Sequence, residues 1–190
     1  MEHTLINIVY FALLNLVIVL PGYVFLKKKM VLLSWAMLLL VVLLICFIFK
    51  DESPIIKMLA IIATTFSGMK VIAATVSYSK KRPALTFTQW FVFAVGWVGM
   101  QAHPFENLGG KPIPGSWQMI RFGISRVFGG ALLILIAHLM VRAHLNHTLT
   151  HISVSILLLV GFSLILHFGL LSISAGTWRL SGVNTYYLFR

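Results

Sequence analysis

Acidic residues are almost missing from this sequence. Only four of its 190 residues are Asp or Glu (Glu2, Asp51, Glu52 and Glu106), against 15 Lys and Arg, so the formal net charge is +11. So few carboxylates leave little material for paired acid–base catalysis or for a site that binds hard metal ions. The cations stand in short runs between apolar segments, which argues against a basic face for nucleic acid. We interpret them as loop residues that set membrane topology and meet anionic headgroups.

Cysteine and charge of either sign are also scarce. The single cysteine, Cys46, cannot form an internal disulfide and gives no indication of a redox compartment. Charged residues make up 10% of the chain and hydrophobic ones 59%, with a mean hydropathy of +0.97, whereas a soluble domain has about 25% and 45–50%. This composition predicts one integral, multi-pass membrane domain over residues 1–190, in the cytoplasmic membrane if the source is bacterial.

The apolar runs predict an all-α bundle of about six transmembrane helices. We expect no cleaved signal peptide, because the first run is too long and is followed by Lys27–Lys29. Pro21 and Gly22 should kink or end the first helix. One long Gly/Pro-rich stretch, Gln101–Arg121, cannot be continuous helix and is either a solvent-side connector or a re-entrant segment. The six expected spans are Leu5–Leu26, Met30–Phe49, Ile55–Ser79, Ala84–Met100, Val127–Val141 and Ile152–Leu171.

Positive charge indicates the orientation of the first half. Lys27–Lys29 and Lys80–Arg82 both belong on the cytoplasmic side, which places the N-terminus outside. Simple alternation of six spans then puts Lys111, Arg121 and Arg126 outside, against the same rule. One re-entrant segment would reverse the orientation of the C-terminal half.

The third expected span carries Gly68, Lys70 and several hydroxyl side chains. Small and hydroxylated residues favour close helix contacts, so this span should be buried among the others. Lys70 lies within it, where a charge costs about 2.5–3.5 kcal/mol on insertion scales. Either Lys70 faces a wet cavity or an anionic group, or it snorkels from a shallow helix.

Histidines form the other group of candidate residues. His144, His147 and His151 would share one helical face, but no cysteine or acid lies near them, so we expect interfacial histidines and no metal site. His167 is either a buried histidine bonded to a neighbouring helix or an intramembrane general base. No partner can be assigned to it, and the common hydrolase, metalloprotease and nucleotide-binding motifs are absent. We therefore predict no catalytic residue.

Two stretches resemble the wax-synthase-like branch of the membrane-bound O-acyltransferases. The first is G-W-V-G-M-Q-A-H-P-F at residues 96–105, similar to a W-P-G-M stretch that ends in an acid, a basic residue and Pro-Phe. Val98 stands at the proline, Gln101 at the acid and His103 at the arginine of that pattern. The second comprises H-F-G at 167–169, W-R at 178–179, G-V-N at 182–184 and L-F-R at 188–190. The resemblance covers roughly residues 90–190.

The resemblance implies an enzyme that transfers a fatty acyl group from acyl-CoA to an alcohol hydroxyl, without a further cofactor. The family's F-W-G-x-R-W-N block and catalytic histidine would lie downstream, so this chain is expected to be the N-terminal portion, supplying scaffold and part of an acyl tunnel. A missing C-terminal half or a partner chain would complete it. By resemblance, the residues near the tunnel or its mouth are Trp97, His103, Trp178 and Arg179.

Two other classes of protein stay open. The chain could be a non-catalytic membrane protein, either a degenerate family member or a subunit for lipid binding or assembly. It could also be a small transporter or channel, in which Lys70 lines a pore. A downstream catalytic block separates the enzyme from the first of these, and solute flux in liposomes would identify the second.

Overall fold

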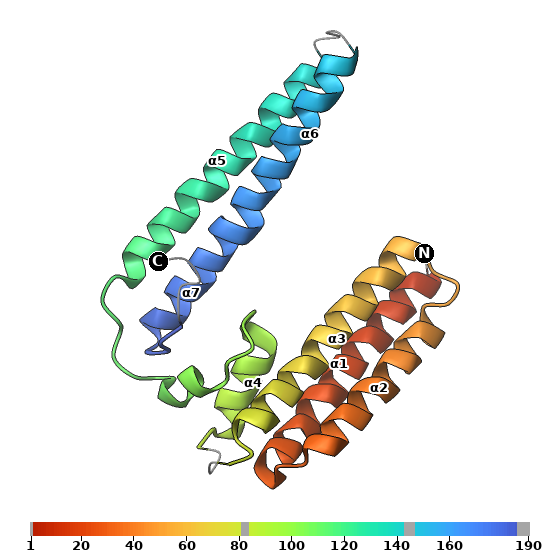
Figure 1. Cartoon of the computed structure of the whole chain (residues 1–190), viewed down its shortest axis with the longest axis vertical. Coiled ribbons are helices and arrows are strands. Elements are labelled where there is room, and N and C mark those ends of the chain that lie inside the picture. Colours follow the sequence, from red (N-terminus) through yellow and green to blue (C-terminus); the bar gives the residue numbers. More distant parts are fainter. Residues whose placement is uncertain (1, 81–83, 143–146, 186–190) are drawn as a thin grey trace. The chain divides into compact units, whose positions relative to one another are not determined.

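The computed structural model describes residues 2–80, 84–142 and 147–185, with side chains from residue 6 onward and, in the last range, from residue 148. These residues contain helices and no strand, and five helices are long and apolar enough to cross a membrane. The predicted all-α, polytopic membrane bundle is confirmed. The chain forms two compact units, residues 1–106 and 107–190 (Figure 1).

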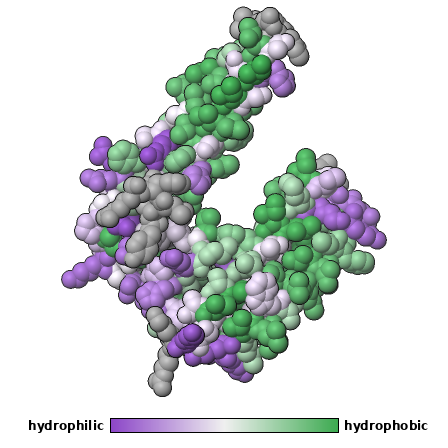
Figure 2. Space-filling model, in the orientation of Figure 1, coloured by the Kyte–Doolittle hydropathy of each residue, from purple (hydrophilic) through white to green (hydrophobic). Residues whose placement is uncertain are grey.

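Unit 1 is a bundle of three long helices and one short helix. Helices α1 (Glu2–Lys28), α2 (Val31–Ile48) and α3 (Pro54–Ser77) run antiparallel in succession, and α3 packs on both of the others (Figure 1). Helix α3 begins where Ser53 accepts a hydrogen bond from the Ile56 amide and Pro54 takes the first helical position. Apolar side chains cover the helices, and hydrophilic ones gather at helix ends (Figure 2).

The first helix does not end at Pro21, because α1 continues for seven residues beyond it to Lys28. The neighbouring Gly22 has a different use. A Cβ atom there would lie 2.8 Å from the Val71 side chain and 2.9 Å from the Trp90 ring. The missing side chain lets α3 and the short helix α4 (Phe87–Gly96) approach α1, and the Trp90 indole N–H donates to the Val19 carbonyl at 2.8 Å.

The expected fourth span, Ala84–Met100, is also wrong as a span. Helix α4 has only 10 residues, about 15 Å at ~1.5 Å per residue, half of a bilayer's hydrocarbon core. Its start is fixed by a capping box between Thr86 and Gln89. Beyond Gly96 the chain becomes irregular and returns, so that the Gln89 side chain donates to the Glu106 carbonyl at 3.0 Å. Residues 86–106 therefore form a re-entrant hairpin within unit 1.

Unit 2 is a long helical hairpin. Helix α5 (Ser116–Arg142) packs along one continuous helical stretch made of α6 (His147–Ser163), a π-helical segment η2 (Leu164–Leu170) and α7 (Leu171–Leu180) (Figure 1). Both helical stretches are longer than the expected spans: α5 begins eleven residues before Val127, and the last helix continues nine residues beyond Leu171. Gly176 is buried inside α7.

Small residues at intervals of seven make the contact face of α5. Its four buried residues are Ser116, Gly123, Gly130 and Ala137. A Cβ on Gly130 would lie 2.6 Å from the Gly161 carbonyl oxygen, so the two backbones touch there. On the opposite helix the matching glycines are eight and then seven residues apart, Gly161, Gly169 and Gly176. The π segment starts after Gly161 and includes Gly169. It accommodates the extra residue, which keeps all three on the contact face.

Candidate functional site

Lys70 caps the end of the re-entrant helix. Its Nζ atom donates to the carbonyl oxygens of Phe93 (3.2 Å), Ala94 (2.9 Å) and Trp97. These carbonyls belong to the last turn of α4 and the residue after it, where a helix leaves acceptors without partners. A cation at a helix C-terminus is also favoured by the helix dipole. Lys70 is 2% exposed, so the snorkelling interpretation is wrong.

The three carbonyls match the three N–H donors of an ammonium group. The amine also lies 5.1 Å from the centre of the Phe66 ring and 5.4 Å from that of Phe93, close enough for cation–π attraction. The charge is thus compensated by backbone dipoles and aromatic faces within unit 1. The sequence showed that Lys70 is an unusual residue in an apolar span. It did not show that Lys70 binds the end of α4, because hydropathy does not reveal where a short apolar helix ends.

An open groove of about 570 Å³ lies beside this cap. Three segments line it, residues 11–19 of α1, residues 63–70 of α3 and residues 94–98 at the end of α4. Its lining is mostly apolar, and three of its polar side chains donate to backbone carbonyls. Asn15 donates to the Phe11 carbonyl and Ser67 to the Ala63 carbonyl, each within its own helix, and Lys70 holds α4. Trp97 borders this groove.

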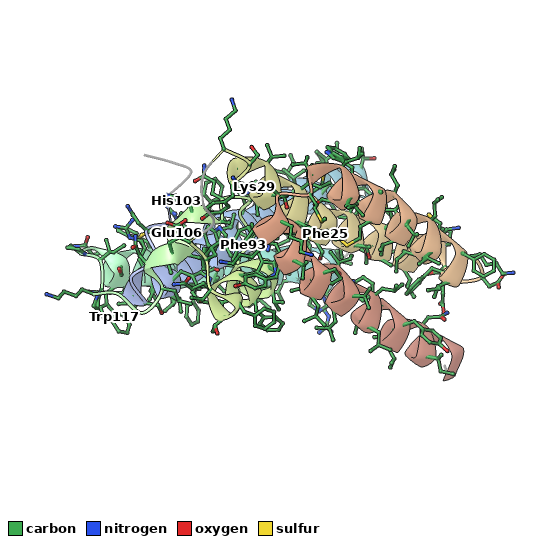
Figure 3. The ribbon with its side chains drawn as sticks, turned by 90° about the horizontal axis from the view of Figure 1, so that it is seen from below. Phe25, Lys29, Phe93, His103, Glu106 and Trp117 are labelled. Carbon is green, nitrogen blue, oxygen red and sulfur yellow. The ribbon has the colours of Figure 1, made fainter. Side chains whose placement is uncertain are left out.

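A second polar cluster lies where the re-entrant hairpin returns. The short helix η1 (His103–Asn107) carries His103 and Glu106 on one side, with Nε2 of His103 3.7 Å from Oε2 of Glu106 (Figure 3). Tyr78, the residue that ends α3, donates its hydroxyl hydrogen to Oε1 of Glu106. Burial and then the Glu106 carboxylate raise the pKa of Tyr78 above its ordinary value. Tyr78 is buried, whereas His103 is exposed to solvent.

This cluster modifies the interpretation of the motif stretch. Gln101 replaces the acid of the resembling pattern, and it is exposed. The acid next to the basic position is instead Glu106, three residues after His103. The i, i+3 spacing of the two was visible in the sequence, but Tyr78, 28 residues before Glu106, was not predictable as their third member.

The other two predicted site residues, Trp178 and Arg179, lie in unit 2 at the end of α7. The Trp178 carbonyl accepts hydrogen bonds from the Ser181 and Val183 amides and so closes the helix. The Arg179 guanidinium donates to Asn184, to the Thr185 carbonyl and to the Pro114 carbonyl, each at 3.3 Å. Trp97 and His103 thus belong to unit 1, in the groove and in the Tyr78 cluster respectively, and Trp178 and Arg179 belong to a turn of unit 2.

The histidines of the last helix do not converge on a site among the described residues. His167 lies in the π segment, and its side chain is exposed, so the expectation of a buried histidine is wrong. Its ring meets the Phe168 ring edge to face at 5.1 Å. His138 and His151 are exposed as well. The side chains of His144 and His147 lie outside the described residues, and within that description no three His, Cys, Asp or Glu residues form a metal-binding group.

These features define a polytopic, all-α membrane protein with a short helical hairpin and an apolar groove in unit 1. No protein-family model, curated protein or solved structure matches this chain.

Proposed function

We propose that this chain binds the acyl chain of a lipid substrate in the groove of unit 1, as the N-terminal part of a wax-synthase-like O-acyltransferase that uses acyl-CoA and an alcohol. One observation carries the proposal. Residues 94–98, which line the groove, overlap the G-W-V-G-M stretch on which the resemblance to that family rests. A mostly apolar groove with a few polar groups at one end suits a fatty acyl chain.

The proposal assigns binding, and not bond making, to these residues. Acyl transfer to a hydroxyl needs a general base within hydrogen-bond reach of the alcohol. The three polar side chains that line the groove, Asn15, Ser67 and Lys70, all donate to backbone carbonyls. The family's F-W-G-x-R-W-N block does not occur within the 190 residues. The chemistry would come from a further segment or a partner chain.

The same observation favours a second candidate, a lipid-binding subunit without acyltransferase activity. A groove whose Asn15, Ser67 and Lys70 side chains already donate to backbone carbonyls can hold an acyl chain without transferring it. The two candidates agree on the ligand and differ in whether membranes that contain the chain esterify alcohols.

The test compares acyl transfer and acyl binding in the same membranes. Native membranes would be assayed for acylation of a long-chain alcohol by a fatty acyl-CoA, with Ala63→Trp to fill the groove. Ala63 lines the groove and is exposed to it, so the indole should fit without breaking the core. Ala131→Trp, at an exposed alanine of α5 outside the groove, is the matched control. We expect Ala63→Trp alone to lower acyl transfer at equal expression.

Loss of acyl-chain binding in Ala63→Trp, with no esterification by the wild type, would support the lipid-binding subunit. Unchanged binding and unchanged transfer in Ala63→Trp would reject both candidates.

We also propose that the N-terminus lies outside and that the re-entrant hairpin reverses the second half. The hairpin begins and ends at one end of unit 1, so it adds no crossing, and α5 then starts on the cytoplasmic side. This orientation agrees with the positive-inside rule, although Lys57, in the first turn of α3, also lies toward the outer end. The cations that it places inside are Lys27, Lys28, Lys29, Lys80, Lys81, Arg82, Lys111, Arg121 and Arg179, against Lys50 and Arg142 outside.

Single cysteines in a Cys46→Ser background would test this orientation. The exposed positions Lys111, Ser79 and Ser53 suit the test. A thiol at Lys111 and one at Ser79 should react with an impermeant maleimide from the same side of the membrane, and one at Ser53 from the opposite side. Labelling of the Ser79 and Lys111 positions from opposite sides would contradict the re-entrant topology.

A further inference from the structure

The turn after α7 is fastened to the loop that precedes α5. The Gly109 amide donates to the Ser181 carbonyl at 2.9 Å, and the Ile113 amide donates to the Arg179 carbonyl at 3.0 Å. Gly182 adopts a positive φ of 82°, and a Cβ there would lie 2.7 Å from backbone atoms of Gly110. Two backbone segments distant in sequence are thus held in direct contact, and Arg179 stands at their junction.

The Arg179 guanidinium is only partly satisfied at this junction. Nη1 donates to the Asn184 side chain and the Thr185 carbonyl, and Nη2 donates to the Pro114 carbonyl. Each distance is 3.3 Å, longer than the ~2.7–2.9 Å of a charge-assisted bond. Nε is buried and has no acceptor among the described residues. Nη2 carries two N–H groups and donates to one acceptor, the Pro114 carbonyl at the surface, so one of its N–H groups is left for a further acceptor.

No carboxylate side chain in this part of the sequence can neutralise Arg179. Residues 107–190 contain no Asp or Glu and six cations, Lys111, Arg121, Arg126, Arg142, Arg179 and Arg190. Within the described residues, the guanidinium's acceptors are neutral carbonyls and one amide oxygen. The bonds to Asn184 and Pro114 lie at the surface, so the charge is open to a ligand from that side.

The position of the junction indicates which anion is available. Trp117, at the start of α5, is 66% exposed, and Trp178 is half-buried at the end of α7. Tryptophans at helix ends mark the level of the lipid headgroups. Lys111, in the loop that is fastened to the turn, is exposed. Lys111 and Arg179 lie on segments joined by backbone hydrogen bonds, and cations at headgroup depth are placed to meet phosphate.

We propose that Arg179 and Lys111 form a site for a phosphate-bearing ligand, with Nη2 of Arg179 donating to a phosphoryl oxygen and Lys111 adding a second charge. The phosphate belongs either to an anionic lipid headgroup or to coenzyme A. This inference goes beyond the acyl groove, since it concerns other residues in another unit, and it holds whether or not the chain takes part in acyl transfer.

Native mass spectrometry of the full chain in detergent tests the site. Two pairs of probes separate the sources of phosphate: phosphatidic acid against diacylglycerol, and coenzyme A against pantetheine, which lacks phosphate. The variants are Arg179→Gln, Lys111→Gln and, as a control of equal charge change, Arg142→Gln at the other end of α5. Loss of a charged hydrogen-bond pair should weaken binding about tenfold in Arg179→Gln.

Binding of phosphatidic acid but not diacylglycerol, weakened by Arg179→Gln and Lys111→Gln and unchanged in Arg142→Gln, would establish a lipid phosphate site. The same pattern with coenzyme A against pantetheine would establish a coenzyme site. Equal loss in all three variants, or no loss in the first two, would overturn the proposal and leave Arg179 as a clamp of the turn.

Arg179→Gln could weaken the fold of the turn as well as the ligand. Lys111→Gln covers that case, because no hydrogen bond of the Lys111 side chain holds the junction together in the described structure. It should lower phosphate binding by about threefold, a fraction of a full charged bond, with an unchanged melting temperature. Normal binding by a stably folded Lys111→Gln, together with a melting defect in Arg179→Gln, would also overturn the proposal.

Discussion

Replacing Lys70 by Met should destabilise unit 1 more than any other single change to a lysine. The substitution keeps the length and apolar stem of the side chain but removes all three donors from the carbonyls of Phe93, Ala94 and Trp97. A buried acceptor left without a partner costs about 1–3 kcal/mol. The site is dry, because Lys70 is 2% exposed. Loss of the two cation–π contacts adds about 1 kcal/mol.

The desolvation energy of the lysine charge acts in the opposite direction and favours Met. Met does not have to remove a charge from water, and the desolvation of a buried ion costs several kcal/mol. The free energy lost at the three carbonyls and the two rings is larger than the desolvation energy saved, so we expect a net destabilisation of about 2–4 kcal/mol. The damage should concentrate in α4, whose last turn loses its cap.

The assay is reversible unfolding of the detergent-solubilised chain by increasing SDS, combined with hydrogen exchange of the α4 amides. Lys57→Met is the matched control, since Lys57 lies on the same helix and is only half-buried. We expect less than about 0.5 kcal/mol for it, as for other surface changes. If Lys70→Met and Lys57→Met unfold alike, and α4 exchange is unchanged, the capping role of Lys70 is refuted.

Three further predictions concern the remaining contacts. Gly130→Val should destabilise unit 2 by about 1–3 kcal/mol because its side chain would enter the Gly161 backbone, whereas Gly129→Val, with open space around it, should be nearly neutral in thermal unfolding. Gly182→Ala should lower the melting temperature more than Gly109→Ala, since both need a positive φ but only Gly182 faces another backbone. The raised pKa of Tyr78 means that folding favours its neutral form, so this stabilisation is complete below the unfolded value of ~10 and is lost as the pH rises above it. Melting temperatures between pH 9 and 11.5 should therefore fall for the wild type and fall less steeply for Tyr78→Phe.

Much of the fold was predictable because hydropathy and helix length determine it. The first three spans agree with α1, α2 and α3 to within a few residues, and the expected burial of the third is confirmed by eight buried residues in α3. Hydropathy predicted a 17-residue span where α4 has only 10 residues, because the residues after the end of α4 are apolar as well. What ends that helix is Lys70, 23 residues before Phe93, and such a long-range partner has no local signal.

The contact face of unit 2 does not follow the common small-xxx-small pattern, which is spaced by four. Its residues Ser116, Gly123, Gly130 and Ala137 repeat by seven. On the opposite helix the π segment lengthens one interval to eight, so Gly161, Gly169 and Gly176 follow no single period in the sequence. The sequence singled out Arg179 only by resemblance. It could not predict the hydrogen bonds of Arg179, because Pro114 precedes α5 whereas Thr185 follows α7.

The acyl groove of unit 1 can be tested most directly with a fatty acyl-CoA that carries a diazirine on its chain. After illumination of native membranes, cross-linked residues would be mapped by mass spectrometry. Binding in the groove predicts labels concentrated in residues 11–19, 63–70 and 94–98, and their loss in Ala63→Trp but not in Ala131→Trp. Labels spread evenly over lipid-exposed side chains such as Leu43 and Phe47 of α2, unchanged in Ala63→Trp, would contradict it.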